Sequence, residues 1–444
     1  MDQRFVWVSE FISNVRPYIE VRLEDNVLIK RPNVVQKLNP SGAVILHGLL
    51  KGKSIEGLLR NIGDNEQQKQ ELYSFLIAVK SSLEGNLDVW TMNEAVVKTK
   101  FEAPFTSLPV LSEVAVTGKC NLRCSFCYAG INHGCTTQSA DLSTEQLIRI
   151  IRKIRMQAMV PSISFTGGEP TLREDLCELI SFAKSLDMRV NLISNGFLID
   201  ETMAAAFSTA GLDSAQISLE GVSRETHERI TGMPGSFANA LNAVKMLTSA
   251  GIRTHTNTTL SKQNMHEAPL LPSFLKNKLN AERFSMNLII PTGSALANNM
   301  HLIPYADAGQ IIKEINQASL AAGVEFMWYS PTPLCIFNTI TEGLGNKGCA
   351  ACDGLLSVDP EGNILPCSSW NEPLGNLLKD DFNSVWFTDR ATQIRNKKSA
   401  PEVCFGCDSL HLCQGACPLF YRSGCNQDSE LLQSRKSNIT QKVI

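Results

Sequence analysis

The chain has 444 residues, with 41 Lys or Arg against 44 Asp or Glu, so its formal net charge at neutral pH is -3. That balance argues against binding to nucleic acid or to an anionic membrane, because both attract strongly basic proteins. Hydrophobic residues make up 43% of the chain, which is enough for a large core. The first residues lack the pattern of a secretion signal, and no apolar run is long enough to span a membrane, so we expect a cytoplasmic protein of several domains.

The N-terminal part, residues 1–100 including a linker, reads as a small domain of strands followed by helices. Residues 18–24 alternate in character, Asp25-Asn26 supplies a turn, and residues 27–30 continue as a second strand, which predicts a β-hairpin. Asn39 before Pro40 is a predicted N-cap for a helix whose core residues include Val44 and Leu49. Two further helices are expected near residues 55–62 and 72–83.

In the middle part, residues 101–330, short β-rich runs alternate with longer helical ones. The predicted strands are 113–117, 162–165, 189–193, 215–219, 252–259 and 283–289. This alternation predicts parallel strands joined by crossover helices, hence an α/β fold, either a doubly wound sheet or a partial (β/α)6 TIM-like barrel. In such folds the chemistry lies at the carboxyl ends of the strands.

Three cysteines follow the first predicted strand with the spacing C-x3-C-x2-C: Cys120, Cys124 and Cys127. A reducing cytoplasm disfavours disulfides, so metal binding is the expected use of these thiols. Three thiolates on one loop suit three irons of a four-iron cluster and leave the fourth iron open to a ligand. A structural zinc site would instead use four protein ligands.

The stretch from Cys120 to Tyr128 resembles the signature loop of the radical S-adenosylmethionine (SAM) enzymes. The resemblance implies that the open iron binds SAM, and that SAM is cleaved to a 5′-deoxyadenosyl radical that abstracts hydrogen from an unactivated carbon. The sequence Gly-Gly-Glu-Pro after the second strand fits this, because glycines permit close approach and a carboxylate complements the ammonium of SAM. The SAM contacts that the resemblance implies are Phe126, Gly167, Gly168, Glu169, Ser194, Asn195, Ser218 and Glu220.

The C-terminal part, residues 331–444, holds nine of the 14 cysteines and has little apolar material for a core of its own. Bound metal is therefore its expected main source of order. Its cysteine pattern resembles the SPASM extension of radical SAM enzymes, which implies two auxiliary four-iron, four-sulfur (4Fe-4S) clusters in addition to the radical SAM cluster. A zinc ribbon over residues 404–417 is the alternative.

The same resemblance assigns ligands to these two clusters. The outer cluster would take Cys404, Cys407, Cys413 and Cys425. The inner cluster would take Cys349, Cys367 and Cys417, with Cys335 or Cys352 as a fourth ligand, or none until substrate binds. Three such clusters use eleven of the 14 cysteines and leave Cys135, Cys177 and one of the two ambiguous residues as spares.

The N-terminal part resembles the winged-helix peptide-binding domain of ribosomal peptide maturation systems. That resemblance implies that the leader of a precursor peptide adds as a strand to the edge of the hairpin. The predicted function is thus a radical SAM oxidoreductase that installs a thioether or carbon–carbon crosslink in a precursor peptide. Its expected partners are that peptide and a reducing electron donor such as flavodoxin or ferredoxin.

Two rival functions follow from the same residues. The first is a protein oxidase of the sulfatase-maturase type, although such enzymes carry Asp after the inner-cluster cysteine, where this chain has Ser368 after Cys367. The second is a non-catalytic, zinc-stabilised peptide-binding protein. No general base is assigned: Glu220, His227 and His255 lie at or near strand ends, where each is more often structural than catalytic.

Overall fold

The computed structural model describes residues 2–84, 105–131, 141–297 and 301–422. The chain divides into two compact units, Met1–Val110 and Leu111–Ile444. The predicted ligand Cys425 and the spare Cys135 both lie outside the described residues. Within the described ranges, no helix has the length and apolar character needed to cross a membrane.

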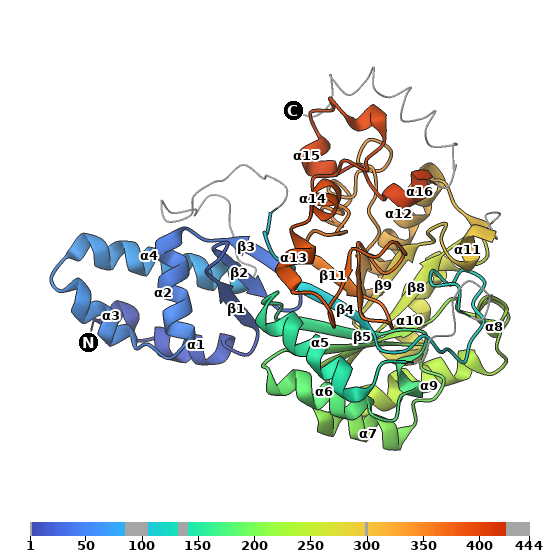
Figure 1. Ribbon diagram of the computed structural model, residues 1–444, viewed down its shortest axis with the longest axis horizontal. Coiled ribbons are helices and arrows are strands. Elements are labelled where there is room, and N and C mark those ends of the chain that lie inside the picture. The colour runs from blue at the N-terminus through green and yellow to red at the C-terminus, as the bar shows by residue number, and fades with distance from the viewer. Residues whose placement is uncertain (1, 85–104, 132–140, 298–300, 423–444) are drawn as a thin grey trace. The chain divides into compact units, whose positions relative to one another are not determined.

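The N-terminal unit combines a three-stranded antiparallel sheet, in the order β1-β2-β3, with helices (blue in Figure 1). The predicted hairpin is confirmed: Val21 pairs with Leu28 across β1 and β2. The sequence did not predict β3, whose Val35 pairs with Ile29. The elements are α1 (Val8–Val15), β1 (Ile19–Arg22), β2 (Val27–Lys30), β3 (Val34–Lys37), α2 (Pro40–Leu50), α3 (Ile55–Ile62) and α4 (Glu66–Glu84).

Helix α2 begins where the sequence predicts. The side-chain oxygen of Asn39 accepts a hydrogen bond from the amide of Gly42 at 2.6 Å, and Pro40 is the first helical residue. The prediction that Val44 belongs to the core is wrong, because its side chain is 57% exposed. The buried face of the helix comprises Ala43, Leu46 and Leu49, which are three residues apart and so share one face. Val44 lies beside this buried face.

A buried ion pair ties the end of the N-terminal unit to its sheet. Arg22 on β1 donates to both carboxylate oxygens of Asp25, at 2.8 and 2.7 Å, and to the carbonyls of Leu108 and Pro109, at 3.0 and 2.8 Å. The amide of Ser107 also donates to Asp25, at 3.1 Å. Burial opposes ionisation of Asp25, but the Arg22 guanidinium outweighs it and lowers the pKa of that carboxyl. The Arg22 guanidinium therefore connects the last residues of the N-terminal unit to strand β1.

The second unit contains a ten-stranded sheet with the order β10-β9-β8-β7-β6-β5-β4-β11-β12-β13, and strands β4 to β10 are parallel. The predicted α/β fold is confirmed, and a partial TIM barrel is consistent with it. All six predicted strands are present, and β10 adds a seventh that the sequence did not predict. The elements are β4 (Leu111–Ala115), α5 (Thr144–Met156), β5 (Ser162–Thr166), α6 (Leu176–Ser185), β6 (Arg189–Ser194), α7 (Glu201–Ala210), β7 (Ser214–Ser218), α8 (Arg224–Thr231), α9 (Ser236–Ser249), β8 (Arg253–Leu260), α10 (Leu271–Leu279), β9 (Arg283–Leu288), α11 (Ser294–Ala297), α12 (Tyr305–Ala322) and β10 (Glu325–Trp328).

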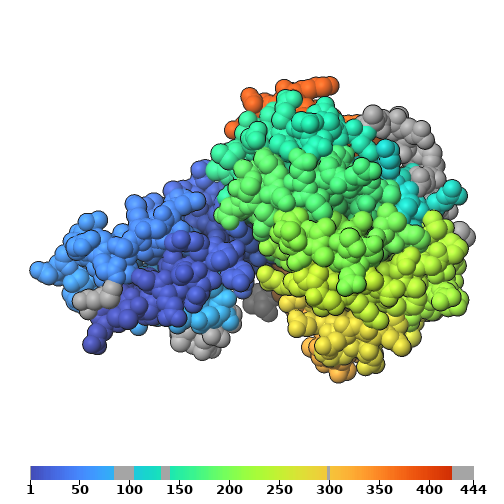
Figure 2. All heavy atoms as spheres, turned by 90° about the horizontal axis from the view of Figure 1, so that it is seen from below, coloured from blue at the N-terminus to red at the C-terminus, as the bar shows by residue number. Residues whose placement is uncertain are grey.

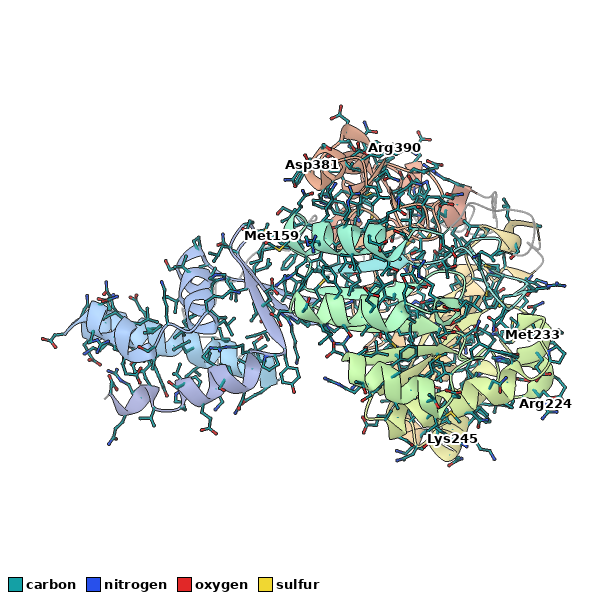
Figure 3. The ribbon with its side chains drawn as sticks, turned by 60° about the horizontal axis from the view of Figure 1, so that its bottom comes forward. Met159, Arg224, Met233, Lys245, Asp381 and Arg390 are labelled. Carbon is teal, nitrogen blue, oxygen red and sulfur yellow. The ribbon has the colours of Figure 1, made fainter. Side chains whose placement is uncertain are left out.

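Helices α5, α6, α7 and α9 cover one face of this sheet (Figure 1), and Figure 2 shows their outer surface in green and yellow. Side chains fill the space between the sheet and these helices, whereas Arg224 on α8 and Lys245 on α9 lie on the outside (Figure 3). On β6, Val190 and Leu192 are fully buried, while Asn191 between them is only half-buried. Alternate residues of the strands therefore face the helical layer and the opposite side of the sheet.

The cysteine-rich segment (orange and red in Figure 1) is joined to the sheet. Strand β11 pairs in parallel with β4, placing Ser357 opposite Glu113, and β12 pairs antiparallel with β11. The expectation that metal is the main source of order needs correction, because the segment also has fully buried aromatic side chains such as Phe382 and Trp386. Its elements are β11 (Leu355–Val358), β12 (Asn363–Leu365), β13 (Gly375–Asn376), α13 (Phe382–Trp386), α14 (Asp389–Arg395), α15 (Leu410–Cys413) and α16 (Pro418–Arg422).

Replacing Arg22 with Ala tests the buried ion pair. The change leaves the Asp25 carboxylate buried without its counter-charge, so we expect the free energy of unfolding of the N-terminal unit to fall by about 3 to 5 kcal/mol. Urea denaturation followed by circular dichroism measures the loss. Arg4→Ala is the matched control, because its partner Glu66 lies at the surface and little change is expected. Equal stability of the two variants would contradict the role given to Arg22.

Acid sensitivity is expected from His255 on β8. Burial, together with the charges of Arg283 and Arg189, lowers the pKa of His255 from 6.5 to about 4. The unfolded chain binds this proton below about pH 6.5, so the stabilisation is complete above that pH and is lost as the pH falls toward 4, by about 3 kcal/mol in total. We expect His255→Gln to weaken this dependence in denaturation curves taken at several pH values. His266→Gln, at a side chain that is 63% exposed, should leave it unchanged.

Candidate active site

The loop that follows β4 carries the three cysteines of the first predicted cluster, Cys120, Cys124 and Cys127. Neighbouring elements hold the backbone of this loop. At the end of α8, the carbonyl of Ile230 accepts a hydrogen bond from the amide of Ser125 at 2.9 Å. At the start of α11, the Ser294 amide donates to the Cys127 carbonyl at 2.9 Å, and its hydroxyl lies 3.1 Å from the same oxygen. Contacts with α8 and α11 therefore fix the backbone of this loop.

The thiols of this loop lie close together in a buried setting. Burial raises the pKa of Cys120 to about 11, and the charges of Glu169 and Cys127 raise it further. Burial also raises the pKa of Cys124 well above its usual value, with contributions from Glu220, Cys127 and Cys120. Thiolates are costly here unless a cation compensates them, which is the environment that iron ligation supplies. None of the 12 described cysteines forms a disulfide.

A single metal ion fits the described residues poorly. Over residues 2–84, 105–131, 141–297 and 301–422, no group of three or more His, Cys, Asp or Glu side chains surrounds a position for one ion. A zinc ion would draw its cysteine sulfurs to about 2.3 Å from one centre. In a four-iron cluster each sulfur binds a different iron, so the thiols stay farther apart.

The predicted Gly-Gly-Glu motif follows β5 and packs directly against the cysteine loop. The amide of Gly168 donates to the carbonyl of Thr117 at 2.8 Å, and the amide of Glu169 donates to that of Lys119 at 2.8 Å. A Cβ on Gly168 would overlap the Lys119 carbonyl and lie 3.0 Å from the Cβ of Cys120. Position 168 therefore requires glycine, because its backbone packs closely against the cysteine loop.

The Glu169 carboxylate gathers the residues predicted after the next strand. It is fully buried and accepts hydrogen bonds from the hydroxyls of Thr171 and Ser194, at 2.6 and 2.7 Å, and from the amide of Asn195 at 2.8 Å. Burial raises the pKa of Glu169, and these hydrogen bonds oppose the shift. The structure thus brings Glu169, Ser194 and Asn195 together beside Cys120.

Asn121 is a candidate that the sequence analysis missed. Its side-chain oxygen accepts a hydrogen bond from the Asn195 side chain at 2.8 Å, and its own amide nitrogen is buried without a hydrogen-bond partner. A buried donor of this kind normally finds an acceptor, so the position suits an oxygen of a bound group such as the SAM carboxylate. The signal available in the sequence was its place between Cys120 and Cys124.

Glu220, after β7, lies on the other side of the cysteine loop. Its carboxylate accepts from the amide of Thr259 at 2.8 Å, and burial raises its pKa to about 8. The backbone amide of Glu220 donates to Nδ1 of His227 at 3.0 Å, which gives that buried histidine a structural role. The charge of Glu220 raises the pKa of the Cys124 thiol. Glu169 and Glu220 therefore flank different cysteines.

The two remaining predicted contacts occupy different surroundings. Ser218 ends β7 in register with Asn257 on β8 and is half-buried, two residues before Glu220. Phe126 packs against an apolar cluster whose members are Ile289, Ala295 and Leu302. Phe126 therefore anchors the cysteine loop to the segment that follows β9. That packing accounts for an aromatic residue at this position.

Glu113 is a second candidate that the sequence analysis missed. It lies on β4, and the Ser368 hydroxyl donates to its carboxylate at 2.6 Å. Burial raises the pKa of Glu113, and this hydrogen bond opposes the shift. Its charge raises the pKa of both Tyr128, which follows the first cysteine group, and Cys367. A buried carboxyl thus lies between the first cysteine group and the inner one.

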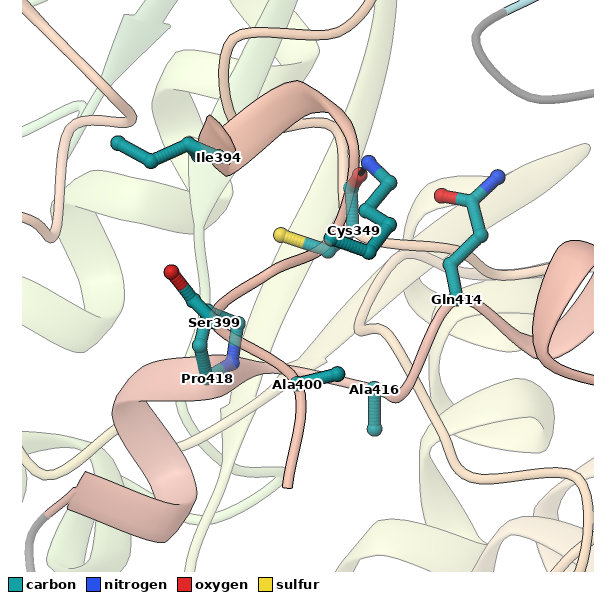
Figure 4. A pocket seen from close by; sticks show the side chains of 8 residues that line it. Cys349, Ile394, Ser399, Ala400, Gln414, Ala416 and Pro418 are labelled. Atoms are coloured by element: carbon teal, nitrogen blue, oxygen red, sulfur yellow. Dashed lines mark hydrogen bonds between the residues drawn. The ribbon is translucent and has the colours of Figure 1, made fainter. Parts of the chain in front are cut away.

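The predicted inner cysteines Cys349, Cys367 and Cys417 lie together. Burial raises the pKa of Cys367 well above its usual value, and the charges of Cys349 and Cys417 add to the effect. Lys397 donates to the Cys349 carbonyl and pairs with Asp353 at 3.0 Å. Cys349 also lines a small cavity (Figure 4). Residues beside Cys417 share that cavity, whose other walls include Ile394, Ser399, Ala400, Gln414, Ala416 and Pro418.

Cys352 lies with this inner group. Its amide donates to the Pro366 carbonyl at 3.1 Å, next to Cys367, and its carbonyl accepts from Arg395 at 2.8 Å. Burial raises the pKa of Cys352 to about 12, with a further contribution from the charge of Cys349. The described residues thus bring four thiols together at the predicted inner site.

The described outer cysteines are Cys404, Cys407 and Cys413. The Cys407 amide donates to the Cys404 carbonyl at 3.1 Å, which forms a tight turn between the two thiols. Burial raises the pKa of Cys404 to about 12, with contributions from Cys413, Cys335 and Cys407. These predicted ligands are therefore neighbours in the folded chain.

Curated relatives match the larger part of the chain. An AdoMet-dependent heme synthase from Oleidesulfovibrio alaskensis is 26% identical over 318 residues, covering 68% of this chain and 80% of that protein. A PqqA peptide cyclase from Granulibacter bethesdensis is 27% identical over 312 residues, with the same two coverages of 68% and 80%. The crystal structure of Streptococcus suis SuiB bound to precursor peptide SuiA has a TM-score of 0.67 at 18% identity, covering 90% of this chain and 94% of that one.

Family profiles match both cysteine-bearing parts of the chain. Residues 114–271 match the radical SAM superfamily, and residues 349–408 match the SPASM iron–sulfur cluster-binding domain. The first match contains the cysteine loop, the Gly-Gly-Glu motif and Glu220, and the second contains the inner cysteines Cys349, Cys352 and Cys367. The chain therefore belongs to the radical SAM superfamily and carries a SPASM domain.

Proposed function

We propose that this radical SAM enzyme installs a crosslink in a ribosomally made precursor peptide. The observation that carries the proposal is the extent of the similarity to SuiB, which covers 90% of the chain and so includes part of the N-terminal unit. The curated relatives cover only 68% of the chain. An additional compact unit with its own sheet and helices is well suited to recognise the substrate.

The edge of the N-terminal sheet supports peptide binding. In the described sheet β3 is an outer strand, and Val34 on it is 53% exposed. The other outer strand, β1, is covered by α2, from which Nδ1 of His47 lies 3.0 Å from the Val21 carbonyl. An extended leader that adds to β3 would gain main-chain hydrogen bonds there.

At the radical SAM site, residues of this chain would bind the cluster and orient SAM. Cys120, Cys124 and Cys127 would hold the cluster, which together with SAM supplies a 5′-deoxyadenosyl radical when reduced by a flavodoxin or ferredoxin. Glu169 would accept the SAM ammonium, because its buried charge favours a cation. The unpartnered amide of Asn121 would donate to the SAM carboxylate.

Two auxiliary clusters complete the proposed set of three. The inner cluster would take Cys349, Cys352, Cys367 and Cys417. The outer cluster would take Cys404, Cys407 and Cys413 with a fourth thiolate, for which the family resemblance names Cys425. An oxidative crosslink removes one hydrogen atom, one proton and one electron from the peptide, and a neighbouring cluster is a suitable acceptor for that electron.

Ser368 alone does not argue against the sulfatase-maturase alternative. It stands where those enzymes carry Asp, but its hydroxyl donates a hydrogen bond to the carboxylate of Glu113 at 2.6 Å. A carboxyl that can accept a proton is therefore present, supplied by β4. The N-terminal unit is the feature that favours a leader-dependent peptide as the substrate.

Tetrapyrrole chemistry is the second candidate function. Relatives named as AdoMet-dependent heme synthase and Fe-coproporphyrin III synthase are 26% and 28% identical to this chain. They cover 68% of it, whereas the similarity to SuiB covers 90%. Titration with an iron porphyrin, monitored by its visible absorbance, distinguishes the two candidates. Binding would favour tetrapyrrole chemistry, and no binding would favour a peptide maturase.

Anaerobically reconstituted protein should contain about twelve irons per chain and cleave SAM to 5′-deoxyadenosine when reduced. We expect Cys124→Ala to lose about four irons and all SAM cleavage while staying folded, because contacts with α8 and α11 hold the loop. Iron analysis, chromatography and circular dichroism measure these effects. Cys177→Ala, on α6, is the control and should keep both properties. Zinc in place of iron would reject the radical mechanism.

A proline on β3 tests leader binding. The Leu38 amide donates to Asn26 at the end of β2, so by alternation the amide of Lys37 faces the open edge. Peptides selected from a random display library on the full-length chain should bind Lys37→Pro roughly tenfold more weakly, because one main-chain hydrogen bond is lost. Lys37→Ala keeps the amide and should bind as the unaltered chain does. Equal binding by both variants would place the peptide elsewhere.

A further inference from the structure

We propose that Cys335 supplies the fourth thiolate of the outer iron–sulfur cluster, beside Cys404, Cys407 and Cys413. The inference rests on the proposed set of auxiliary clusters and deepens it. The sequence resemblance considered Cys335 only for the inner cluster and named Cys425 for the outer one. The folded chain supports a different assignment, because it brings the Cys335 loop to the outer cysteines.

Hydrogen bonds on both sides of Cys335 tie its loop to α15. The amide of Leu334, the preceding residue, donates to the Cys413 thiol sulfur at 3.4 Å. Farther along the same loop, the Asn346 side chain donates to the carbonyl of Leu412 at 3.0 Å. Helix α15 ends at Cys413. Cys335 is therefore on a segment that is attached to an outer ligand through adjacent residues.

A local turn fixes the backbone at Cys335. The amides of Ile336 and Phe337 both donate to the Pro333 carbonyl, at 2.9 and 3.0 Å. The turn restricts the backbone at the residue it encloses. A preformed ligand binds with a smaller loss of conformational entropy.

Electrostatics agree with this placement. Burial is the main cause that raises the pKa of Cys404, and among the neighbouring charges that of Cys335 is second to Cys413 and ahead of Cys407. Cys335 is thus close enough to Cys404 for their charges to interact, although it lies far away in sequence, which agrees with the contact between Leu334 and Cys413.

The inner site does not require Cys335. Cys352 is connected to the residue before Cys367 by a hydrogen bond of 3.1 Å and is close enough to Cys349 for their charges to interact. With Cys367 and Cys417, these two residues make four thiols for the inner cluster. The inner cluster is then complete without Cys335.

Ligation by Cys335 would connect the outer cluster to the barrel. The Cys335 loop packs on α12, where a Cβ on Gly309 would lie 2.8 Å from the Phe337 ring, and the Asn316 side chain donates to the Glu342 carbonyl at 2.9 Å. Helix α12 lies directly before β10. A cluster held from this loop is thus held by the wall of the barrel as well as by the SPASM segment.

The test compares iron and acid-labile sulfide in reconstituted full-length variants. We expect Cys335→Ala to alter the electron paramagnetic resonance spectrum of the reduced protein and to lower the iron content by up to about four per chain. Cys335→Ser, which is nearly isosteric, should show the same spectral change and serves if the alanine variant does not fold. Cys425→Ala should keep the iron content and the spectrum of the unaltered chain.

Combined variants identify the cluster that is affected. In a Cys407→Ala background, which disables the outer cluster, adding Cys335→Ala should remove no further iron, whereas adding Cys352→Ala should. In a Cys367→Ala background, which disables the inner cluster, adding Cys335→Ala should remove further iron, whereas adding Cys352→Ala should not. The proposal is overturned if Cys335→Ala is additive with Cys407→Ala, or if Cys425→Ala alone removes the outer cluster. Unaltered protein without iron would overturn the proposed function itself.

Discussion

The pairing of β4 with two neighbours determines where the chemistry of this protein lies. On one side β4 pairs in parallel with β5, so the cysteine loop and the Gly-Gly-Glu motif leave the sheet at the same edge. On the other side it pairs in parallel with β11, which places Ser357 opposite Glu113. Through the β11–β12 hairpin this second pairing also positions Cys367. Because β12 runs antiparallel to β11, its carboxyl end, which Cys367 follows, lies toward the amino ends of β4 and β11, whereas the cysteine loop follows the carboxyl end of β4. One strand thus connects the radical SAM residues with the SPASM residues.

Close packing of backbone against backbone makes the first of these arrangements possible. The amides of Gly168 and Glu169 bond to the carbonyls of the cysteine loop, and only glycine leaves room for this at position 168. The same contact puts the Glu169 carboxylate beside Cys120 and within reach of Ser194 and Asn195. These contacts fix the Gly-Gly-Glu motif against the cysteine loop.

The electrostatic cost of this arrangement explains why it suits metal clusters. Burial raises the pKa of these thiols, and neighbouring carboxyls add to the effect, as Glu220 does for Cys124 and Glu113 for Cys367. Without a cation nearby, the protonated form of such thiols is favoured. Iron compensates the negative charge, so ligation by these thiolates is coupled to the release of their protons. Cluster assembly is then expected to stabilise the second unit as well as to activate it.

The sequence by itself determined what depends on local spacing. The C-x3-C-x2-C loop, the N-cap at Asn39 and the alternation of strands and helices could all be predicted, because each is encoded within a few neighbouring residues. Short outer strands such as β3 and β10 were missed, since pairing with a neighbour stabilises them more than their own composition does. Only the tertiary structure decided that Cys352 joins the inner cysteines, that Cys335 lies near the outer ones, and that Glu113 and Asn121 face the cysteine groups. These positions depend on how distant loops pack, and spacing along the chain carries no information about that.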